Sequence, residues 1–344
     1  MEYSIFEDNF RAEKKKEFED RYSPYCDLVY YNSSRNPKLR LAMRVLKPAK
    51  PSYILVMTHG WHMTIPEFIP METPQEDCDY LTLQVDMRGR AYSEGEADCN
   101  GWELFDVVDA VNFARKNYKE YLIDSSIVYF EGGSGGGGNA YGILGKFPDF
   151  FAAATALCGI SDYALWYEQD EEGEFRDEMD VWVGCTPSQN PNAYKARSGL
   201  HLLENLYTPL FIAHGETDVR VPVVHARNYV KKAKELGKTE LIQYEELPNV
   251  GNRAHWGNAD AEQMERIRRM SEENRVCNRK KTVLPSKGTL IVGGYLFTQN
   301  FSVVLESLDK TAVLEYDLPQ KKFTLHAHEA CVCTITMQPE LNVE

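Results

Sequence analysis

The chain has 344 residues, of which 43% are hydrophobic and 12% aromatic, so it can bury the core of one large domain and a small appended unit. Its net charge of -14, from 52 acidic and 38 basic residues, argues against binding nucleic acid through clustered Lys and Arg. No apolar run is long enough to cross a bilayer, and the charged first residues lack the apolar stretch of a secretory signal. We therefore expect a soluble, cytoplasmic protein without a membrane or nucleic-acid partner.

The eight cysteines are dispersed, without a CxxC pair or a Cys/His cluster at zinc spacing. This pattern favours free thiols and no bound metal. Cys331 and Cys333 form the one close pair, and in a strand this spacing puts both side chains on the same face. Packing in a core is the favoured role for that pair, ahead of metal binding.

The first half of the chain predicts strands followed by a helix. Apolar runs without alternation are typical of parallel strands that are covered on both faces, and the first two segments, joined by a short polar turn, predict a hairpin. Apolar residues at helical intervals over 103–118 predict an amphipathic helix. The expected strands are residues 25–34, 38–49, 52–60, 80–89 and 125–134.

The second half continues the alternation of strands and helices. Helices are expected over residues 138–148 and 225–238, and strands over 150–159, 209–218 and 239–248. This rhythm predicts a doubly wound, mostly parallel α/β sheet with right-handed crossovers.

An insertion at about 161–200 interrupts the alternation between two expected strands. It is long for such a connection, and it combines Trp166, Tyr167 and Trp182 with many acidic residues. We expect it to form a cap. The acidic residues within 168–180 are expected to lie in a solvated loop, but if that loop closed over the site it would repel anionic substrates.

The composition changes again near the carboxyl end. A charged helical stretch over 261–281 is followed by short strand-like runs, of which the first spans 289–297. These runs predict a small β-rich domain over 282–344. The catalytic domain is therefore expected to span 1–281. Whether the smaller unit binds a ligand or braces the larger one is left open.

Residues 132–138 read GGSGGGG between an apolar strand and a helix. A flexible linker there would break the sheet, whereas G-x-S-x-G between a strand and a helix is the pattern of a nucleophile elbow. Such a turn exposes the serine hydroxyl, and the helix that begins behind it favours developing negative charge. Ser134 is thus the candidate nucleophile, and the glycine motifs for phosphates and dinucleotides are not matched.

A nucleophilic serine needs a base and an orienting acid, which after such an elbow follow in the order Ser, Asp or Glu, His. Asp218 and His255 each follow an expected strand by a few residues, in loops at the same edge of the sheet. We interpret Ser134, Asp218 and His255 as a catalytic triad. Three other histidines, which lie before a strand, at a strand end and in a helix, fit less well: His201, His214 and His225.

Backbone N–H groups are expected to hold the oxyanion of a tetrahedral intermediate. One belongs to Gly135, directly after the nucleophile, and the other to Trp61, in the loop after the strand over 52–60. In the nearby Asp-Met-Arg-Gly turn we expect Arg88 to hold loops together through charged hydrogen bonds and to take no part in catalysis.

Together these motifs resemble the α/β-hydrolase fold, and within it the prolyl oligopeptidase-like, dienelactone hydrolase-like and acetylxylan esterase-like branch. The similarity covers roughly residues 25–260 and lies in the segments GGSGGG, TPLFIAHGETDVRVPVVHARNYVKKAK, HGW and DMRGRAYSEG. It implies Ser134 as nucleophile, Asp218 as acid and His255 as base. Prolyl oligopeptidases commonly carry Tyr directly after the nucleophile, where this chain has Gly135.

We therefore expect a serine carboxylic-ester hydrolase that forms an acyl-enzyme and requires no cofactor. Short acyl groups, and acetyl groups on carbohydrate, are the substrates that the resemblance implies, with Trp166, Tyr167 and Trp182 as candidate contacts. A small-molecule or carbohydrate ester is the expected partner. Two alternatives remain: a serine peptidase whose acidic rim binds the amino terminus of short peptides, and a non-catalytic polysaccharide-binding protein that uses residues 282–344.

Overall fold

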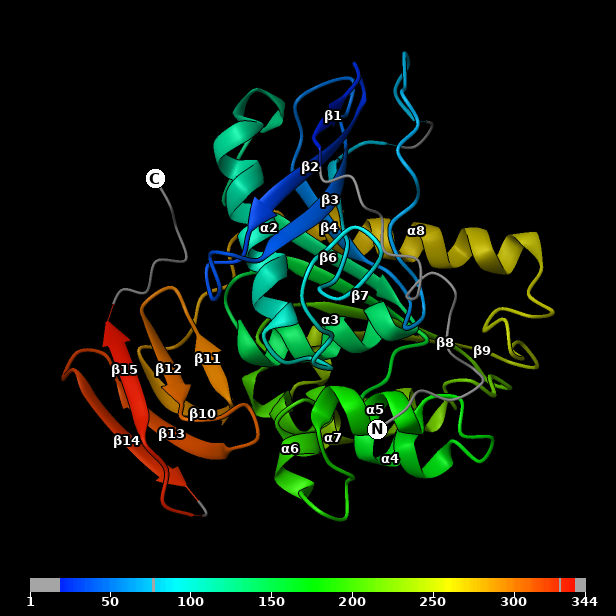
Figure 1. The fold of residues 1–344 in the computed structure, drawn as a ribbon. Helices are drawn as coiled ribbons and strands as arrows, with labels where there is room; N and C mark the ends of the chain where they lie inside the picture. The colour runs from blue at the N-terminus through cyan, green and yellow to red at the C-terminus, as the bar shows by residue number, and fades with distance from the viewer. Residues whose placement is uncertain (1–18, 76–77, 328, 338–344) are drawn as a thin grey trace.

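The computed structural model describes residues 19–75, 78–327 and 329–337. It contains a nine-stranded sheet between helices and a separate six-stranded sheet to one side, drawn in orange and red in Figure 1. Residues 1–18, which hold most of the charged start of the chain, and 338–344, which end the expected β-rich domain, lie outside the described residues. No helix in the described part of the chain combines the length and apolar character that a membrane span requires.

The large sheet has the order β1-β2-β3-β5-β4-β6-β7-β8-β9. Strands β4 to β9 pair in parallel, whereas β1, β2 and β3 form an antiparallel edge in which β3 pairs with β5. The bounds are β1 Arg21–Tyr22, β2 Cys26–Asn32, β3 Arg40–Leu46, β4 Ile54–Thr58, β5 Leu81–Val85, β6 Val128–Gly133, β7 Ala153–Leu157, β8 Leu210–Gly215 and β9 Ile242–Leu247. The predicted hairpin and the mostly parallel sheet are thereby confirmed.

Helices cover both faces of this sheet, as its apolar strands require. On one face, α2 (Glu103–Asn117), α3 (Gly135–Lys146) and α7 (Val224–Glu235) share one hydrophobic core with the strands. On the other face lies α8 (Ala261–Cys277), which begins with a capping box at Asp260. The predicted α/β-hydrolase fold is confirmed by this arrangement (Figure 1).

The insertion between β7 and β8 consists of short helices around an aromatic core that also includes Trp61, from the loop after β4. They are α4 (Tyr163–Gln169), α5 (Arg176–Val183), α6 (Pro191–Lys195) and the 3-10 helix η2 (Gly199–Asn205). The Asp162 carboxylate accepts the first free N–H groups of α4, and α5 ends at Gly184 with φ 84°. Two further 3-10 turns, η1 (Lys119–Tyr121) and η3 (Thr239–Leu241), precede β6 and β9.

The smaller sheet is antiparallel throughout, in the order β14-β13-β10-β11-β12-β15. Its strands are β10 Lys287–Gly293, β11 Tyr295–Phe297, β12 Phe301–Leu305, β13 Thr311–Asp317, β14 Lys322–Ala327 and β15 Cys333–Met337. The segment 289–297, expected as one strand-like run, is divided between two strands because Gly294 adopts a φ of 71°.

The two sheets share core residues. The Tyr295 ring stacks on Trp102 at a centroid distance of 4.5 Å, and its hydroxyl donates to the Gly101 carbonyl at 2.8 Å. Tyr295 and Phe297 both belong to the hydrophobic core that lies beneath α2 and α3. The small sheet is thus anchored to the α/β layers through buried aromatic residues.

Candidate active site

Ser134 lies at the turn between β6 and α3, where the elbow pattern places it. Its φ of 56° and ψ of -117° lie in a region that non-glycine residues rarely adopt. The Ser134 N–H donates to the Leu157 carbonyl of β7 at 2.8 Å, and its own carbonyl accepts the Gly138 N–H at 3.0 Å. These bonds hold the strained turn, and Ser134 lines a pocket beside it.

The glycines after Ser134 let backbone segments approach one another. A Cβ on Gly135 would lie 2.5 Å from the Trp61 nitrogen, and one on Gly136 would lie 2.5 Å from the Thr58 carbonyl oxygen. Larger residues would therefore push α3 away from β4 and its following loop. The two backbone segments predicted to hold an oxyanion, at Gly135 and Trp61, are brought into direct contact by this packing.

Asp218 and His255 come together from the loops after β8 and β9. The His255 Nδ1 donates to Asp218 Oδ2 at 2.7 Å, while Asp218 Oδ1 accepts the N–H groups of Arg220 and Val221. The Asp218 carboxylate is fully enclosed, so these donors replace its water. With Nδ1 occupied, Nε2 is the nitrogen of His255 that can take a proton.

Ser134 and His255 line the same pocket, which has a volume of about 450 Å³. Trp61, Trp166 and Phe175 form part of its wall. The structure therefore gathers the three predicted triad residues from three separate loops. A nucleophile, an oriented imidazole and a space for an acyl group at one place are the parts of acyl-transfer chemistry.

The other three histidines considered as the catalytic base lie outside the pocket that contains Ser134. His214 Nε2 is bonded to the Val221 carbonyl at 2.7 Å, and burial lowers the pKa of its imidazole. Burial and neighbouring His214 lower the pKa of His225 to about 3, and His201 lies 3.3 Å from Asp162. None of these three rings lines the pocket that contains Ser134.

One group of metal-ligand types lies within the described residues, formed by Cys158, His214 and Asp218, whose ligand atoms lie within 4.8 Å of one another. Asp218 is already bonded to His255, and His214 Nε2 to a carbonyl. Burial, followed by the charge of Asp218, raises the pKa of the Cys158 thiol well above its usual value. We therefore assign the group to the surroundings of the triad.

His59 ties the Trp61 loop to the turn after β5. It accepts the Met87 N–H on Nε2 at 3.1 Å, and Nδ1 lies 2.8 Å from the Gly60 carbonyl. Burial and the nearby Arg90 lower the pKa of His59 to about 3, so the ring is neutral and can accept and donate at once.

Only one of the three aromatic residues proposed from the sequence to contact substrate lies on the pocket. Trp166 lines it, whereas Trp182 packs against the Trp61 ring at 4.6 Å and Tyr167 against Tyr194 at 6.1 Å. The structure therefore brings Trp166 to this pocket, whereas contact of Tyr167 and Trp182 with substrate stays a prediction. Both rings are used to pack the helices of the insertion.

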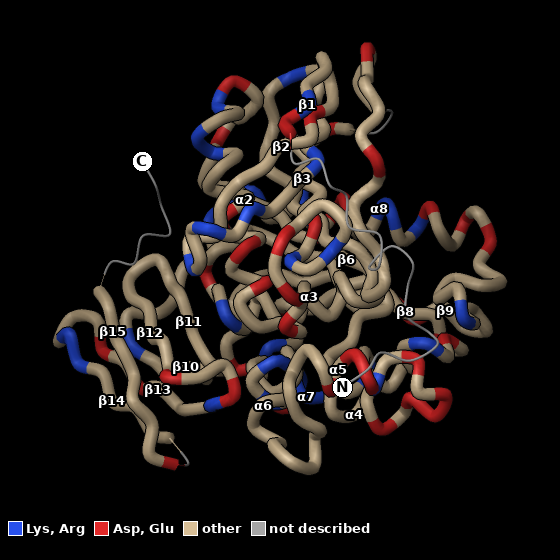
Figure 2. The backbone as a smooth tube through the Cα atoms, viewed as in Figure 1, with Lys and Arg blue, Asp and Glu red and all other residues tan. Residues whose placement is uncertain are grey.

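The acidic segment that joins α4 to α5, marked by several acidic positions in Figure 2, lines a second pocket, which shares Trp166 and Arg220 with the pocket that contains Ser134. Glu174 pairs with Arg220, and Glu172 pairs with Arg253. The buried Asp170 accepts the N–H groups of Glu174, Phe175 and Arg176. The expectation of a solvated loop is wrong for its buried acids, which are Asp170, Glu174 and Glu178. Backbone N–H groups compensate the charge of Asp170, and Arg220 compensates that of Glu174.

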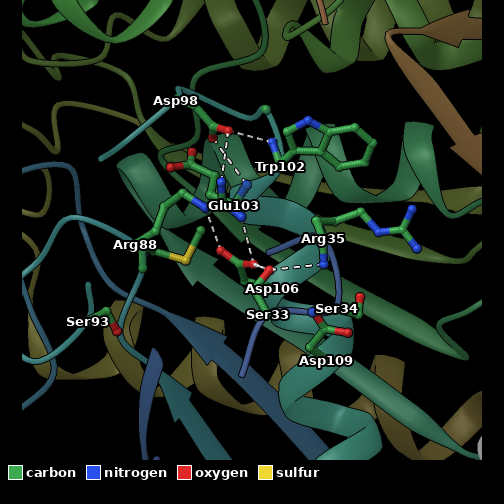
Figure 3. Close-up of polar contacts among 12 residues, drawn as sticks. Ser33, Ser34, Arg35, Arg88, Ser93, Asp98, Trp102, Glu103, Asp106 and Asp109 are labelled. Carbon is green, nitrogen blue, oxygen red and sulfur yellow. Dashed lines mark hydrogen bonds and ion pairs between the residues drawn. The ribbon is translucent and has the colours of Figure 1, made fainter. Parts of the chain in front are cut away.

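Arg88 has the structural role expected of it (Figure 3). Its Nε and Nη2 donate to the two oxygens of Asp106 at 2.6 and 2.8 Å, a bidentate pair inside the protein. Asp106 also accepts the Ser33 hydroxyl at 2.8 Å. Arg88 thus joins the turn after β5 to α2 and to the end of β2.

Sequence reasoning missed several residues at the pocket, including His62, Cys158, Arg220 and Arg253. The position of Arg220, two residues after the acid of the triad, was the one available signal. The others come from loops whose paths depend on the insertion.

Residues 73–272, more than half of the chain, match the model of the prolyl oligopeptidase family. The chain belongs to the prolyl oligopeptidase family. Its members share the serine-hydrolase chemistry of the α/β-hydrolase superfamily, and Ser134, Asp218 and His255 all lie within the matched range. The match thus places this chain in a family of serine hydrolases.

Relatives within this group carry both esterase and peptidase names. The chain is 23% identical over 240 residues to Esterase LipQ of Mycobacterium tuberculosis, covering 65% of this chain and 56% of LipQ. It is 31% identical over 166 residues to the Uncharacterized peptidase YuxL of Bacillus subtilis, covering 45% of this chain and 22% of YuxL. This prolyl oligopeptidase family member thus matches about half, or less, of the length of these relatives.

A solved structure shows the same fold. The acylaminoacyl peptidase of Pyrococcus horikoshii superposes with a TM-score of 0.60 at 20% identity, over 77% of this chain and 42% of that one. The likeness supports the α/β-hydrolase architecture of this family member.

Proposed function

We propose that this protein hydrolyses carboxylic esters with short acyl groups through an acyl-enzyme on Ser134. The observation that carries the proposal is the 2.7 Å bond from His255 to the enclosed Asp218, on a ring that shares a pocket with the strained Ser134. Asp218 fixes the tautomer of His255, so that Nε2 can remove the proton of the serine hydroxyl.

In the proposed reaction, the Ser134 oxygen attacks the ester carbonyl while His255 Nε2 takes its proton. The N–H groups of Gly135 and Trp61 then hold the oxyanion of the tetrahedral intermediate. His255 returns the proton to the leaving alcohol, and the same steps with water as nucleophile release the acid. Asp218 stays ionised throughout and stabilises the imidazolium.

The pocket and the relatives favour a small ester. A space of about 450 Å³ beside Ser134 suits a short acyl group and part of an alcohol, and Trp166 offers an aromatic face to a sugar ring. LipQ is named an esterase. We infer acetyl groups on carbohydrate as the first substrates to examine, with a small-molecule or carbohydrate ester as the binding partner.

Two further assignments accompany this proposal. The eight cysteines are free thiols in the structure, which is consistent with a cytoplasmic location. The catalytic unit is assigned to residues 1–281 and the β-rich unit to residues 282–344, with the shared aromatic core favouring a bracing role for the second.

A comparison of ester and amide substrates tests the reaction type. We expect hydrolysis of p-nitrophenyl acetate, butyrate and octanoate with kcat/KM falling as the chain lengthens, little turnover of an aminoacyl p-nitroanilide, and no turnover by Ser134→Ala. Dominant amide turnover would instead support a peptidase, the alternative that the name of YuxL favours. Unchanged ester turnover in Ser134→Ala would contradict the proposed nucleophile.

A further inference from the structure

The insertion reaches the oxyanion loop through one buried carboxylate. Glu178 lies in the first turn of α5 and has 1% of its surface exposed. Its Oε2 accepts the indole Nε1–H of Trp61 at 2.5 Å and lies 2.8 Å from His62 Nε2. Two consecutive residues of the loop after β4 are thus bonded to a single oxygen on another element.

Burying a carboxylate costs several kcal/mol unless good donors replace its water. Glu178 receives such donors from Trp61 and His62, both of which line the pocket that contains Ser134. The strong hydrogen bonds to an ionised acceptor are also directional, so they restrict where the Trp61 ring can lie. The contact therefore fixes the orientation of the Trp61 ring and also supplies hydrogen-bond donors to the buried Glu178 carboxylate.

Other contacts hold Trp61 from the remaining sides. Arg90 donates to the Trp61 carbonyl at 2.8 Å, so the backbone and the indole of this residue are both bonded. The ring packs between Trp166 at 4.9 Å and Trp182 at 4.6 Å. Since the side chain and the carbonyl are both held, the Trp61 N–H beside Gly135 has little freedom to turn.

We propose that Glu178 is a positioning residue for the oxyanion hole, which acts through Trp61 and makes the insertion a support of the catalytic loop. This inference rests on the proposed function, in which the Trp61 N–H stabilises the oxyanion. It gives the acidic, aromatic insertion a role that neither a solvated loop nor a substrate-binding cap would have.

The test compares an ester with its thiono analogue, in which sulfur replaces the carbonyl oxygen. Sulfur accepts hydrogen bonds weakly, so a correctly aimed oxyanion hole helps the oxygen ester more. We expect Glu178→Ala to lower kcat/KM for p-nitrophenyl acetate by about 10- to 100-fold, somewhat less than loss of a donor, and to affect the thionoester much less. General damage to the fold would lower kcat/KM for both substrates equally.

Two companion variants separate positioning from folding. Glu178→Gln keeps an acceptor for the Trp61 indole and should retain most of the ester-to-thionoester ratio. Glu171→Ala removes an exposed carboxylate from the same acidic segment, and its ratio should stay within about twofold of the parent because it bonds to neither loop residue. Thermal unfolding of each variant reports its folded state.

A double-variant cycle with Trp61→Phe tests whether Glu178 acts through the indole. If it does, the double variant Trp61→Phe, Glu178→Ala should be no slower on the ester than the slower single variant. Losses that multiply would mean that the two residues act independently, which would overturn the inference.

The rate at which a fluorophosphonate labels Ser134 tests the role of Glu178 independently of the proposed substrate. This reagent needs the activated serine and the oxyanion hole but no particular ester. Slower labelling of Glu178→Ala would support the inference even if the parent protein hydrolysed no ester. Labelling at the parent rate, with an unchanged ester-to-thionoester ratio, would overturn it while leaving the ester proposal standing. Absence of labelling in the folded parent would overturn both.

Discussion

Gly135 meets two requirements of the proposed mechanism at once. Its N–H follows the nucleophile directly, and its missing side chain admits the backbone of Trp61, whose nitrogen would lie 2.5 Å from a Cβ at this position. Two backbone N–H groups can bind one oxyanion only if they lie close together. This requires that no side chain separates the two backbones. The glycine-rich sequence around Ser134 is thus explained by contact between backbones.

Substitution of Gly135 tests this contact. Gly135→Ala would force Trp61 and α3 apart, so we expect kcat to fall by about 100-fold or more, as when an oxyanion donor is lost. Gly133→Ala is the matched control, because its methyl group would meet only Leu157 at the ordinary distance of 3.8 Å. A smaller loss of kcat in Gly135→Ala than in Gly133→Ala would contradict the account.

At the scale of residues, the sequence predicted the triad positions and, in the pocket wall, Trp61 and Trp166, but not the other residues of that wall. Ser134, Asp218 and His255 each follow a strand by a few residues, so the strand order alone brings them to one sheet edge. The orientations of the Trp182 and Tyr167 side chains depend on how the short helices of the insertion pack together, and local sequence does not determine this packing. For the same reason, the partners of Glu178 could not be foreseen.

At the scale of elements, α3 connects the nucleophile to the smaller sheet. Its last residue, Lys146, is fully buried, donates to the Gly293 carbonyl at the end of β10 and lies 4.4 Å from the centre of the Tyr295 ring. Burial, together with the charge of Arg197, lowers the pKa of Lys146 to about 7. The helix that follows Ser134 therefore ends on a buried amine whose pKa is lowered to near neutral pH.

This buried amine predicts a pH dependence of stability. Between pH 7 and about 10.5 the unfolded chain keeps a proton on Lys146 that the folded protein releases, so this group makes the free energy of unfolding rise with pH. The parent minus Lys146→Met difference should rise by about 1.4 kcal/mol per pH unit across that window. Urea unfolding at pH 7, 8 and 9 measures it.

The exposed Lys195 supplies the control for that measurement. The parent minus Lys195→Met difference should stay constant with pH, because this side chain is exposed to water in the folded protein as it is in the unfolded chain. A constant difference for Lys146→Met as well would show that this amine is charged and solvated in the folded protein.

The elements themselves were largely predictable. Apolar runs located the parallel strands, since strands covered on both faces lose their alternation. Two features escaped. The helix expected from residue 138 begins at Gly135, because close packing overrides the low helix propensity of glycine. The segment 289–297 forms two strands, because Gly294 turns the chain within an otherwise continuous apolar run.

At the scale of the whole molecule, the small sheet and the insertion both reinforce the α/β layers. Tyr295 and Phe297 belong to the core that α2 and α3 cover, and Glu178 ties α5 to the loop after β4. Composition indicated both additions as departures from the α/β rhythm. It did not show how they dock, because docking depends on pairs of residues far apart in the chain.

The most direct test of the central claim is to trap the acyl-enzyme. The protein is mixed with p-nitrophenyl acetate, quenched in acid during the first turnovers and digested, and the acetylated peptide is found by mass spectrometry. The account predicts one acetyl group, on Ser134, and none in the folded Ser134→Ala protein. An acetyl group on another residue during turnover, or equal ester hydrolysis by Ser134→Ala, would contradict it.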